Sequence, residues 1–269
     1  MALNTLGIIK NGTKIKIPAV FVPEPVYPNA GAHNSRYRGK FLGNSVSAEQ
    51  YAQIKAGTFE DLFIGDYWTI PTTISGNTTN INYRIAGFDY YLHCGDTETT
   101  AHHAVLVPDT VLYTAKMNDS NTTAGGYLGS KMYTSYIANA KTAIKNAFGN
   151  AHILSHRVYL SNAVSGGYVS GGAWADGEVD LMCEQMLFGS GIFSPVSNGS
   201  SVPANARMEK SQLPLFAQDH SKITIRENYW LRDVITGSTF SFVDMFGNPT
   251  NINAGYAYGV RPSFCIYEA

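Results

Sequence analysis

The C-terminal segment, residues 229–269, constrains the fold of this chain more than any other stretch. Two apolar runs with strand-like patterns bracket it: residues 229–234 (YWLRDV) and residues 259–266 (GVRPSFCI). The sequence between them is rich in Thr, Ser, Asn, Gly, Tyr and Phe. We therefore expect the two brackets to be strands of the core. We expect residues 235–258, hereafter the C-terminal surface, to contact a ligand.

The aromatic residues of this surface cannot all point inward from a segment so rich in Gly and Asn. Phe240 and Val243 fit the core side of a strand, whereas Met245, Phe246 and Tyr256 lie among Gly, Asn and Pro residues that favour turns. Tyr combined with Ser, Gly and Asn is typical of antibody paratopes, which pair rigid aromatic area with adaptable hydrogen-bonding groups. An irregular loop whose aromatics fold back onto the domain fits this composition equally well.

The predicted ligand-binding residues share a place in this surface and an apolar or hydrogen-bonding side chain. They are Thr239, Phe242, Asp244, Met245, Phe246, Asn248, Thr250, Asn251, Ile252, Asn253, Tyr256 and Tyr258. Four bracket residues, Trp230, Arg232, Asp233 and Arg261, are predicted to form the scaffold beneath them. Charged side chains in strands commonly tie neighbouring loops through charge-assisted hydrogen bonds, and binding loops need a rigid support.

The run Trp230-Leu231-Arg232-Asp233, followed by residues 259–264 (GVRPSF), resembles the end of C-type-lectin-fold proteins of the formylglycine-generating-enzyme-like branch. It is most similar to the variable proteins of diversity-generating retroelements, a group that includes the phage major tropism determinant. The resemblance covers roughly residues 153–269 and extends more weakly back to about residue 60. It implies an α+β, C-type-lectin-like domain. In this family the segment between the brackets is a ligand-binding surface rewritten by adenine-directed mutagenesis.

The resemblance also implies a function and a location. We expect a receptor-binding protein of a phage virion, such as a tail-fibre adhesin, that binds a host cell-surface protein or glycan and contacts other virion proteins. The family analogy implies a homo-oligomer, specifically a trimer. Such a protein assembles in the host cytoplasm and acts outside the cell as part of the virion. A purely structural virion protein (fibre, decoration or tail component) with the same fold is the alternative that the sequence leaves open.

The amino-acid composition limits the classes of partner that this chain can bind. Charged residues make up only 14% of the chain, against about 25% in ordinary soluble domains, while Gly (26) and Tyr (17) are abundant. The net charge of −1 argues against binding nucleic acid or an anionic membrane through electrostatics. No run approaches the roughly 20 apolar residues that span a bilayer, so we expect no membrane insertion. Residues 1–9 do not match a signal peptide, which leaves phage lysis as the expected route of release.

The candidates for metal and redox chemistry are weak. Cys94, Cys183 and Cys265 are odd in number and lack C-x-x-C spacing, so we expect buried thiols and no disulfide or zinc site. His102 and His103 are adjacent, and neighbours on a strand point to opposite faces. We therefore predict no metal and no cofactor.

We also predict no enzymatic activity. The chain has no nucleophile-elbow, zinc-protease, P-loop or dinucleotide-binding motif. The formylglycine-generating relatives use a copper-binding cysteine pair, which this chain does not match. Asn248-Pro249-Thr250 lacks the carboxylate of a calcium-dependent sugar site.

Two regions are predicted along the chain. Residues 1–45 have a strand pattern at 14–22 and then Pro23, Pro25 and Pro28, which indicates an extended arm for oligomerisation or virion attachment. A disordered leader that packs loosely on its own domain is the alternative. Residues 46–269 form the lectin-like domain. Ser47 and Gln50 form a capping box for a short helix that ends at Gly57.

Periodicity predicts the remaining elements of the domain. The two main helices are expected at residues 127–148 and, after an Asp176 cap, at 177–188. Strands are expected at 62–70, 81–85, 88–93, 104–107 and 153–160, a hairpin loop at 71–80, a flexible glycine loop at 166–172, a further loop at 193–202 and a tight apolar insertion at 209–216. Two helices among short antiparallel strands predict an α+β fold.

Overall fold

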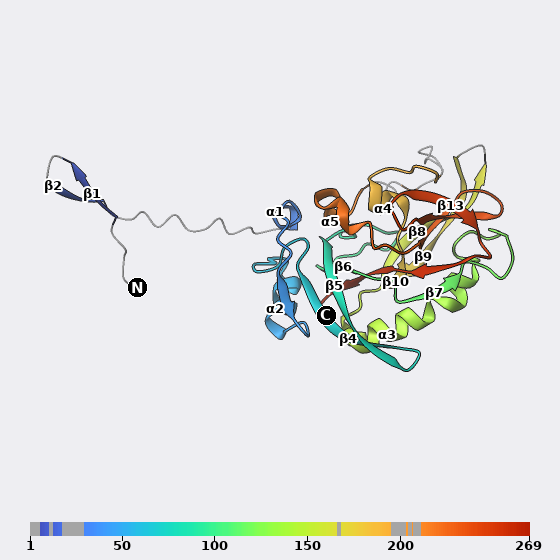
Figure 1. Cartoon of the computed structure of the whole chain (residues 1–269), viewed down its shortest axis with the longest axis horizontal. Coiled ribbons are helices and arrows are strands. Elements are labelled where there is room, and N and C mark those ends of the chain that lie inside the picture. Colours follow the sequence, from blue (N-terminus) through green and yellow to red (C-terminus); the bar gives the residue numbers. More distant parts are fainter. Residues whose placement is uncertain are drawn as a thin grey trace.

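The computed structural model describes residues 6–10, 13–17, 30–165, 168–194, 203, 206 and 211–269 (Figure 1). Within these residues the fold is α+β, as predicted, and strands outnumber helices. Two larger sheets form the body of the molecule, and two separate hairpins complete the strand content. The finer C-type-lectin-like arrangement stays a prediction.

The first large sheet has six strands in the order β10-β15-β6-β5-β4-β3. Their bounds are β3 Phe41–Gly43, β4 Tyr67–Ile74, β5 Asn77–Phe88, β6 Ala104–Pro108, β10 Val179–Leu181 and β15 Pro262–Ile266. Helix α3 (Ala138–Phe148) packs against this sheet, and the ring of Phe148 lies 5.0 Å from the rings of both Tyr83 and Phe264. This aromatic cluster joins the helix to the middle of the sheet.

The second large sheet contains both brackets and has the order β13-β12-β11-β14-β7. Its strands are β7 Tyr113–Lys116, β11 Tyr229–Val234, β12 Thr239–Val243, β13 Pro249–Asn253 and β14 Ala257–Val260. The first bracket is β11, as predicted. The second is divided at Arg261 between β14, in this sheet, and β15, in the other. Phe240 and Val243 are fully buried, as predicted.

The remaining elements are short. They are the hairpin β8 (His156–Ser165) and β9 (Tyr168–Gly177), helices α1 (Ala30–Asn34), α2 (Ala48–Ala56), α4 (Glu184–Phe188) and α5 (Pro214–Gln218), the π-helical turn η1 (Met132–Tyr136), and the 3₁₀ turns η2 (Asn150–His152) and η3 (His220–Lys222). Helix α2 has the predicted capping box at Ser47 and the predicted left-handed stop at Gly57. The predicted apolar insertion at 209–216 contains the start of α5.

The helix predicted at 127–148 is wrong in its first half. The α-helix begins at Ala138, and a π-helical turn and other turns precede it. The Ser130 hydroxyl accepts a hydrogen bond from the Tyr133 N–H, and the Thr134 hydroxyl donates to the Ser130 carbonyl. These local side-chain bonds compete with helical pairing, so the apolar stripe alone overestimated the helix.

The helix predicted at 177–188 with an Asp176 cap is also wrong. Asp176 lies in β9, and Val179 and Leu181 pair with Phe264 and Pro262 of β15. The helix is limited to α4, which begins after Cys183 and ends at Gly189. Pairing with β15 determines this segment, and spacing along the sequence does not reveal that partner.

The predicted glycine loop at 166–172 is in part a strand. Gly172 lies in β9, where a Cβ atom would be 2.5 Å from the ring of Tyr159, so a glycine allows the two strands of the hairpin to pack closely. Residues 166–167 lie outside the described residues, as do residues 195–202 of the loop predicted at 193–202.

The strands around residues 62–93 differ from their predicted bounds. The predicted loop at 71–80 is a continuation of β4 and β5, which turn at Ser75 and Gly76. Both residues have positive φ angles (50° and 85°), as a two-residue hairpin turn requires. Residues 62–66 are irregular apart from an isolated bridge between Ile64 and Tyr37, and residues 89–93 form turns after β5. The strand at 104–107 is confirmed, and the one at 153–160 is confirmed from His156 onward.

The predicted arm, residues 1–45, contains two kinds of structure. β2 (Thr13–Ile17) confirms the first part of the predicted strand, whereas residues 18–22 lie outside the described residues. It pairs with β1 (Leu6–Lys10), which was not predicted. Residues 30–45 belong to the folded domain, because His33 is buried, Asn34 bonds to the backbone of Phe88 and β3 pairs with β4. The boundary at residue 45 is therefore wrong.

A buried carboxylate attaches residues 36–40 to the domain. Asp66 is completely buried and accepts hydrogen bonds from Nε and Nη2 of Arg38 and from the backbone N–H groups of Lys40 and Phe63. The same guanidinium also pairs with Asp61, whose side chain is 63% exposed. One arginine thus has a buried and an exposed carboxylate partner.

Replacing Asp66 with alanine should lower the free energy of unfolding by about 2–4 kcal/mol, because it leaves a guanidinium and two backbone donors without their acceptor. Asp61→Ala removes the exposed partner of the same arginine and should cost less than about 1 kcal/mol. Urea unfolding of both variants measures the difference. Equal losses would show that burial of Asp66 does not determine its contribution.

Candidate functional site

An aromatic row crosses the C-terminal surface from the core to solvent. The Trp230 ring is fully buried and lies 6.1 Å from the Phe242 ring and 5.2 Å from the Tyr258 ring. The Phe242 and Tyr258 rings are 4.6 Å apart, and Tyr256, which is 52% exposed, lies 6.4 Å beyond Tyr258. The outer ring is therefore supported by successively more buried aromatic groups.

The turn between β12 and β13 presents two further apolar side chains. Met245 is 48% exposed and Phe246 is 74% exposed. The Asp244 carboxylate holds this turn by accepting hydrogen bonds from the N–H groups of Phe246 and Asn248. Gly247 has φ near +90°, and a Cβ atom there would lie 2.2 Å from the Thr224 hydroxyl. The exposed side chains thus project from a backbone fixed by its own turn chemistry.

The pKa of the Asp244 carboxyl agrees with its role in holding the turn. Burial alone would raise the pKa of the Asp244 carboxyl, but hydrogen bonds from Asn248, Phe246 and Gly247 hold the pKa below its usual value. Hydrogen bonds that favour the charged form have this effect. Asp244 is therefore ionised at neutral pH and is engaged within the turn.

The predicted ligand-binding residues fall into three groups by exposure. Met245, Phe246, Asn248 and Tyr256 are exposed; Thr239, Asp244, Thr250, Asn251, Ile252, Asn253 and Tyr258 are half-buried; Phe242 is buried. Phe242 supports Tyr258 from below and has little surface for a ligand. The remaining residues are brought together by the pairing of β12 with β13 and by the aromatic row.

Arg261 ties three segments beneath this surface. Its guanidinium is fully buried and donates to the carbonyl oxygens of Pro108, Lys222 and Ile223 and to the Tyr229 hydroxyl. These partners lie at the end of β6, in η3 and its C-cap, and at the start of β11. Arg261 thus joins the two large sheets at the point where β14 becomes β15.

The other predicted scaffold residues also make long-range contacts. Trp230 donates from Nε1 to the Ala115 carbonyl of β7. The Arg232 side chain is 5% exposed and contacts the Met186 sulfur at 3.8 Å, while Asp233 accepts a hydrogen bond from the Glu184 N–H at the start of α4. These residues connect the sheet to helix α4.

Glu184 is a supporting residue that the sequence did not reveal. It is completely buried; Oε1 accepts from the Ser241 hydroxyl of β12, and Oε2 accepts from the N–H groups of Ile192, Phe193 and Ser194. It therefore holds a loop with two exposed apolar side chains, Ile192 (50%) and Phe193 (45%), close to β12. The sequence shows a carboxylate inside an apolar run, which marks Glu184 as unusual. Its hydrogen-bond partners are distant in sequence, so the sequence does not show what it supports.

The groups considered for metal chemistry have other partners. His93 bonds to Glu98, His102 bonds to Asp89, and His103 is buried between the Ala101 carbonyl and the Tyr91 N–H. Among the described residues no cluster of three or more His, Cys, Asp or Glu side chains is placed to hold a metal ion. None of the three cysteines forms a disulfide, and burial raises the pKa of the Cys265 thiol.

Two broader findings complete the description of the site. Of the helices in the described part of the chain, none combines the length and apolarity needed to cross a membrane. No protein-family model, curated protein or solved structure matches this chain.

Arg261→Ala should lower the free energy of unfolding by about 3 kcal/mol, because three carbonyl groups and a buried hydroxyl each lose one donor. It should also increase amide hydrogen exchange in residues 222–229, which lose this anchor, and in residues 244–258, because the turn at 244–248 bonds to Thr224 and Asn228 of the loosened segment. Denaturant unfolding and exchange mass spectrometry measure the two effects.

Arg226→Ala is the control, because it removes an arginine that is exposed, and the free energy of unfolding should change by less than about 0.5 kcal/mol. Normal stability and normal exchange in Arg261→Ala would refute the scaffold role.

Proposed function

We propose that this chain is a receptor-binding protein of a phage virion and that its C-terminal surface contacts a host-cell ligand. The observation that carries the proposal is the combination of exposed Met245, Phe246 and Tyr256 with a fixed support beneath them. Aromatic residues and Met are enriched at protein interfaces, and a preformed surface loses little conformational entropy on binding. The same surface has Thr and Asn side chains for hydrogen bonding.

The virion assignment is supported by the resemblance of the two brackets to retroelement-diversified variable proteins. The ligand is a host cell-surface protein or glycan, and other virion proteins are the second class of partner. The role is binding, without catalysis. The alternative, a purely structural virion component, uses the same fold but predicts that the C-terminal surface has no host ligand.

Several copies of the chain act together in this proposal. A single small patch binds weakly, and display in several copies raises avidity without new contacts. The register of the N-terminal hairpin pairs Leu6 with Ile17 and Ile8 with Ile15, and positions two apart on a strand share a face. These four apolar positions are the region through which we propose that three copies associate.

Soluble protein should block phage adsorption to host cells, and Phe246→Ala combined with Tyr256→Ala should weaken that block at least about tenfold, because both exposed rings leave the surface. Stability should change by less than about 1 kcal/mol. Adsorption competition with purified protein measures the effect.

Light scattering on the same samples should give the mass of a trimer, and a monomer would contradict the association proposed above.

Phe41→Ala is the control for this experiment, because Phe41 is also exposed (49%) but lies on β3, in the other large sheet. It should block adsorption as well as the unaltered chain. If no form of the protein competes, the structural alternative is favoured.

We further propose that the gene is diversified in the codons of this surface. Deep sequencing of the 3′ end in a propagated population should find substitutions concentrated between codons 235 and 258 and located at template adenines. An invariant 3′ end would contradict diversification and would favour an adhesin of fixed specificity.

A further inference from the structure

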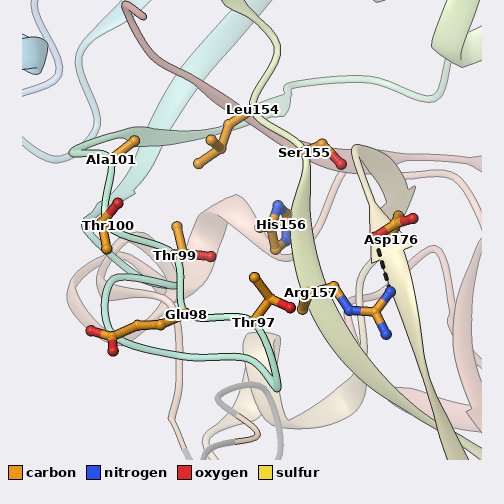
Figure 2. A pocket seen from close by; sticks show the side chains of 10 residues that line it. All are labelled: Thr97, Glu98, Thr99, Thr100, Ala101, Leu154, Ser155, His156, Arg157 and Asp176. Carbon is orange, nitrogen blue, oxygen red and sulfur yellow. Dashed lines mark hydrogen bonds and ion pairs between the residues drawn. The ribbon is translucent and has the colours of Figure 1, made fainter.

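A cleft of about 500 Å³ lies between residues 97–101 and the start of β8, remote in sequence from the C-terminal surface (Figure 2). Pockets of this size accommodate small-molecule ligands. The groups that line it and matter here are the hydroxyls of Thr97, Thr99, Thr100 and Ser155, the imidazole of His156 and the carboxylate of Glu98. Nothing in the proposed adhesin surface uses these residues.

The walls of the cleft are fixed by ion pairs and turns. Arg157 of β8 binds the Asp96 carboxylate through Nε (2.6 Å) and Nη2 (3.0 Å) and binds Asp176 of β9 through Nη1 (2.9 Å). Gly95 has φ near +107°, and a Cβ atom there would be 2.5 Å from the Thr97 carbonyl oxygen. The segment 96–101 is therefore held against β8 without a ligand.

His156 forms the floor of the cleft. Figure 2 shows its ring directed from β8 toward the side of residues 97–101, whereas Arg157 points to the opposite side, toward Asp176. The residue is 7% exposed, its ring lies 3.9 Å from that of Tyr91 at a tilt of 32°, and its buried Nδ1 atom has no hydrogen-bond partner among the described residues. Because Nδ1 is buried, a ligand in the cleft can reach only the small exposed part of this residue.

The neutral charge state of His156 limits the chemical class of ligand that the cleft can bind. Burial, and then the neighbouring His103, lower the pKa of His156 to about 3, so the ring is neutral at pH 7. A neutral imidazole has one N–H donor and one acceptor nitrogen, which suits a hydroxyl group. The hydroxyls of Thr97, Thr99, Thr100 and Ser155 have the same dual capacity.

The charged groups around the cleft exclude anions. The Arg157 guanidinium is already bonded to two carboxylates, and Glu98 and Asp176 add negative charge to the lining. A phosphate or carboxylate ligand would therefore find no available cation and would be repelled. A ligand with several neutral hydroxyls can donate to the carboxylates and exchange hydrogen bonds with the hydroxyls and the imidazole.

We propose that this cleft is a binding site for a saccharide unit, a small neutral ligand with several hydroxyl groups. The site lies on the β8–β9 side of the molecule and is separate from the C-terminal surface. It depends on its own residues and does not rest on the proposed adhesin role. The β8 cleft would give this protein a second ligand-binding site.

Titration of the full chain with methyl glycosides of glucose, galactose, mannose and N-acetylglucosamine tests the proposal. At least one sugar should cause saturable NMR shifts in residues 97–101 and 154–157, including the ring nitrogens of His156. The triple variant Thr97→Val, Thr100→Val and Ser155→Ala should bind that sugar about tenfold or more weakly, because three exposed hydroxyls are lost. These side chains are exposed, so the variant should fold normally.

Controls separate this site from the adhesin surface. Thr73→Val with Thr78→Val makes the same kind of change on the exposed β4–β5 hairpin and should bind like the unaltered chain. The Phe246→Ala and Tyr256→Ala variant should also retain sugar binding. Loss in that variant, equal affinity in the triple variant, the absence of saturable shifts, or binding of ethanolamine in place of the sugars would each overturn the proposal.

Discussion

The buried guanidinium of Arg261 is the interaction on which the C-terminal half depends. It lies where the chain leaves one large sheet and enters the other, so the carbonyl groups of two distant segments, at residue 108 and at residues 222–223, and the hydroxyl of Tyr229 share a single donor group. A buried cation of this kind is stable only when its donors are satisfied, which fixes the relative positions of those segments. The rings of Tyr229 and Phe216, 5.0 and 5.8 Å from the guanidinium carbon, complete its environment. The exposed turn at 244–248 and the aromatic row extend from strands that this arrangement holds in place.

Two buried carboxylates also hold separate segments of the chain together, as the Arg261 guanidinium does. Asp66 collects donors from residues 38, 40 and 63, and Glu184 collects three backbone donors and one hydroxyl. Each carboxylate thus binds backbone N–H groups that lie outside the helices and strands. In a chain with only 14% charged residues, several of the charges are thus placed inside, where one ion can satisfy many backbone groups. This use of charge explains how a fold rich in loops retains a fixed surface.

The sequence predicted the parts of the fold that depend on local pattern. The strand brackets, the buried Phe240 and Val243, the capping box at Ser47 and the stop at Gly57 follow from residues near one another in the chain. The predictions that were wrong depended on distant partners. Residues 179–181 have helical spacing yet pair with β15, and residues 71–80 have loop composition yet form a paired ribbon. The role of Glu184 could not be predicted for the same reason, because Ser241 lies 57 positions away in the chain.

The geometry of the C-terminal surface separates residues that can vary from residues that must not. Met245, Phe246 and Tyr256 project into solvent, so substitutions there should cost less than about 0.5 kcal/mol each. Asp244 and Gly247 instead maintain the turn itself, through hydrogen bonds and a positive φ. A surface that tolerates new side chains needs both kinds of position, because a substitution there keeps the surface intact only if the backbone that carries it keeps its shape. Asp244 therefore fits a supporting role better than the contact role expected from its place in the sequence.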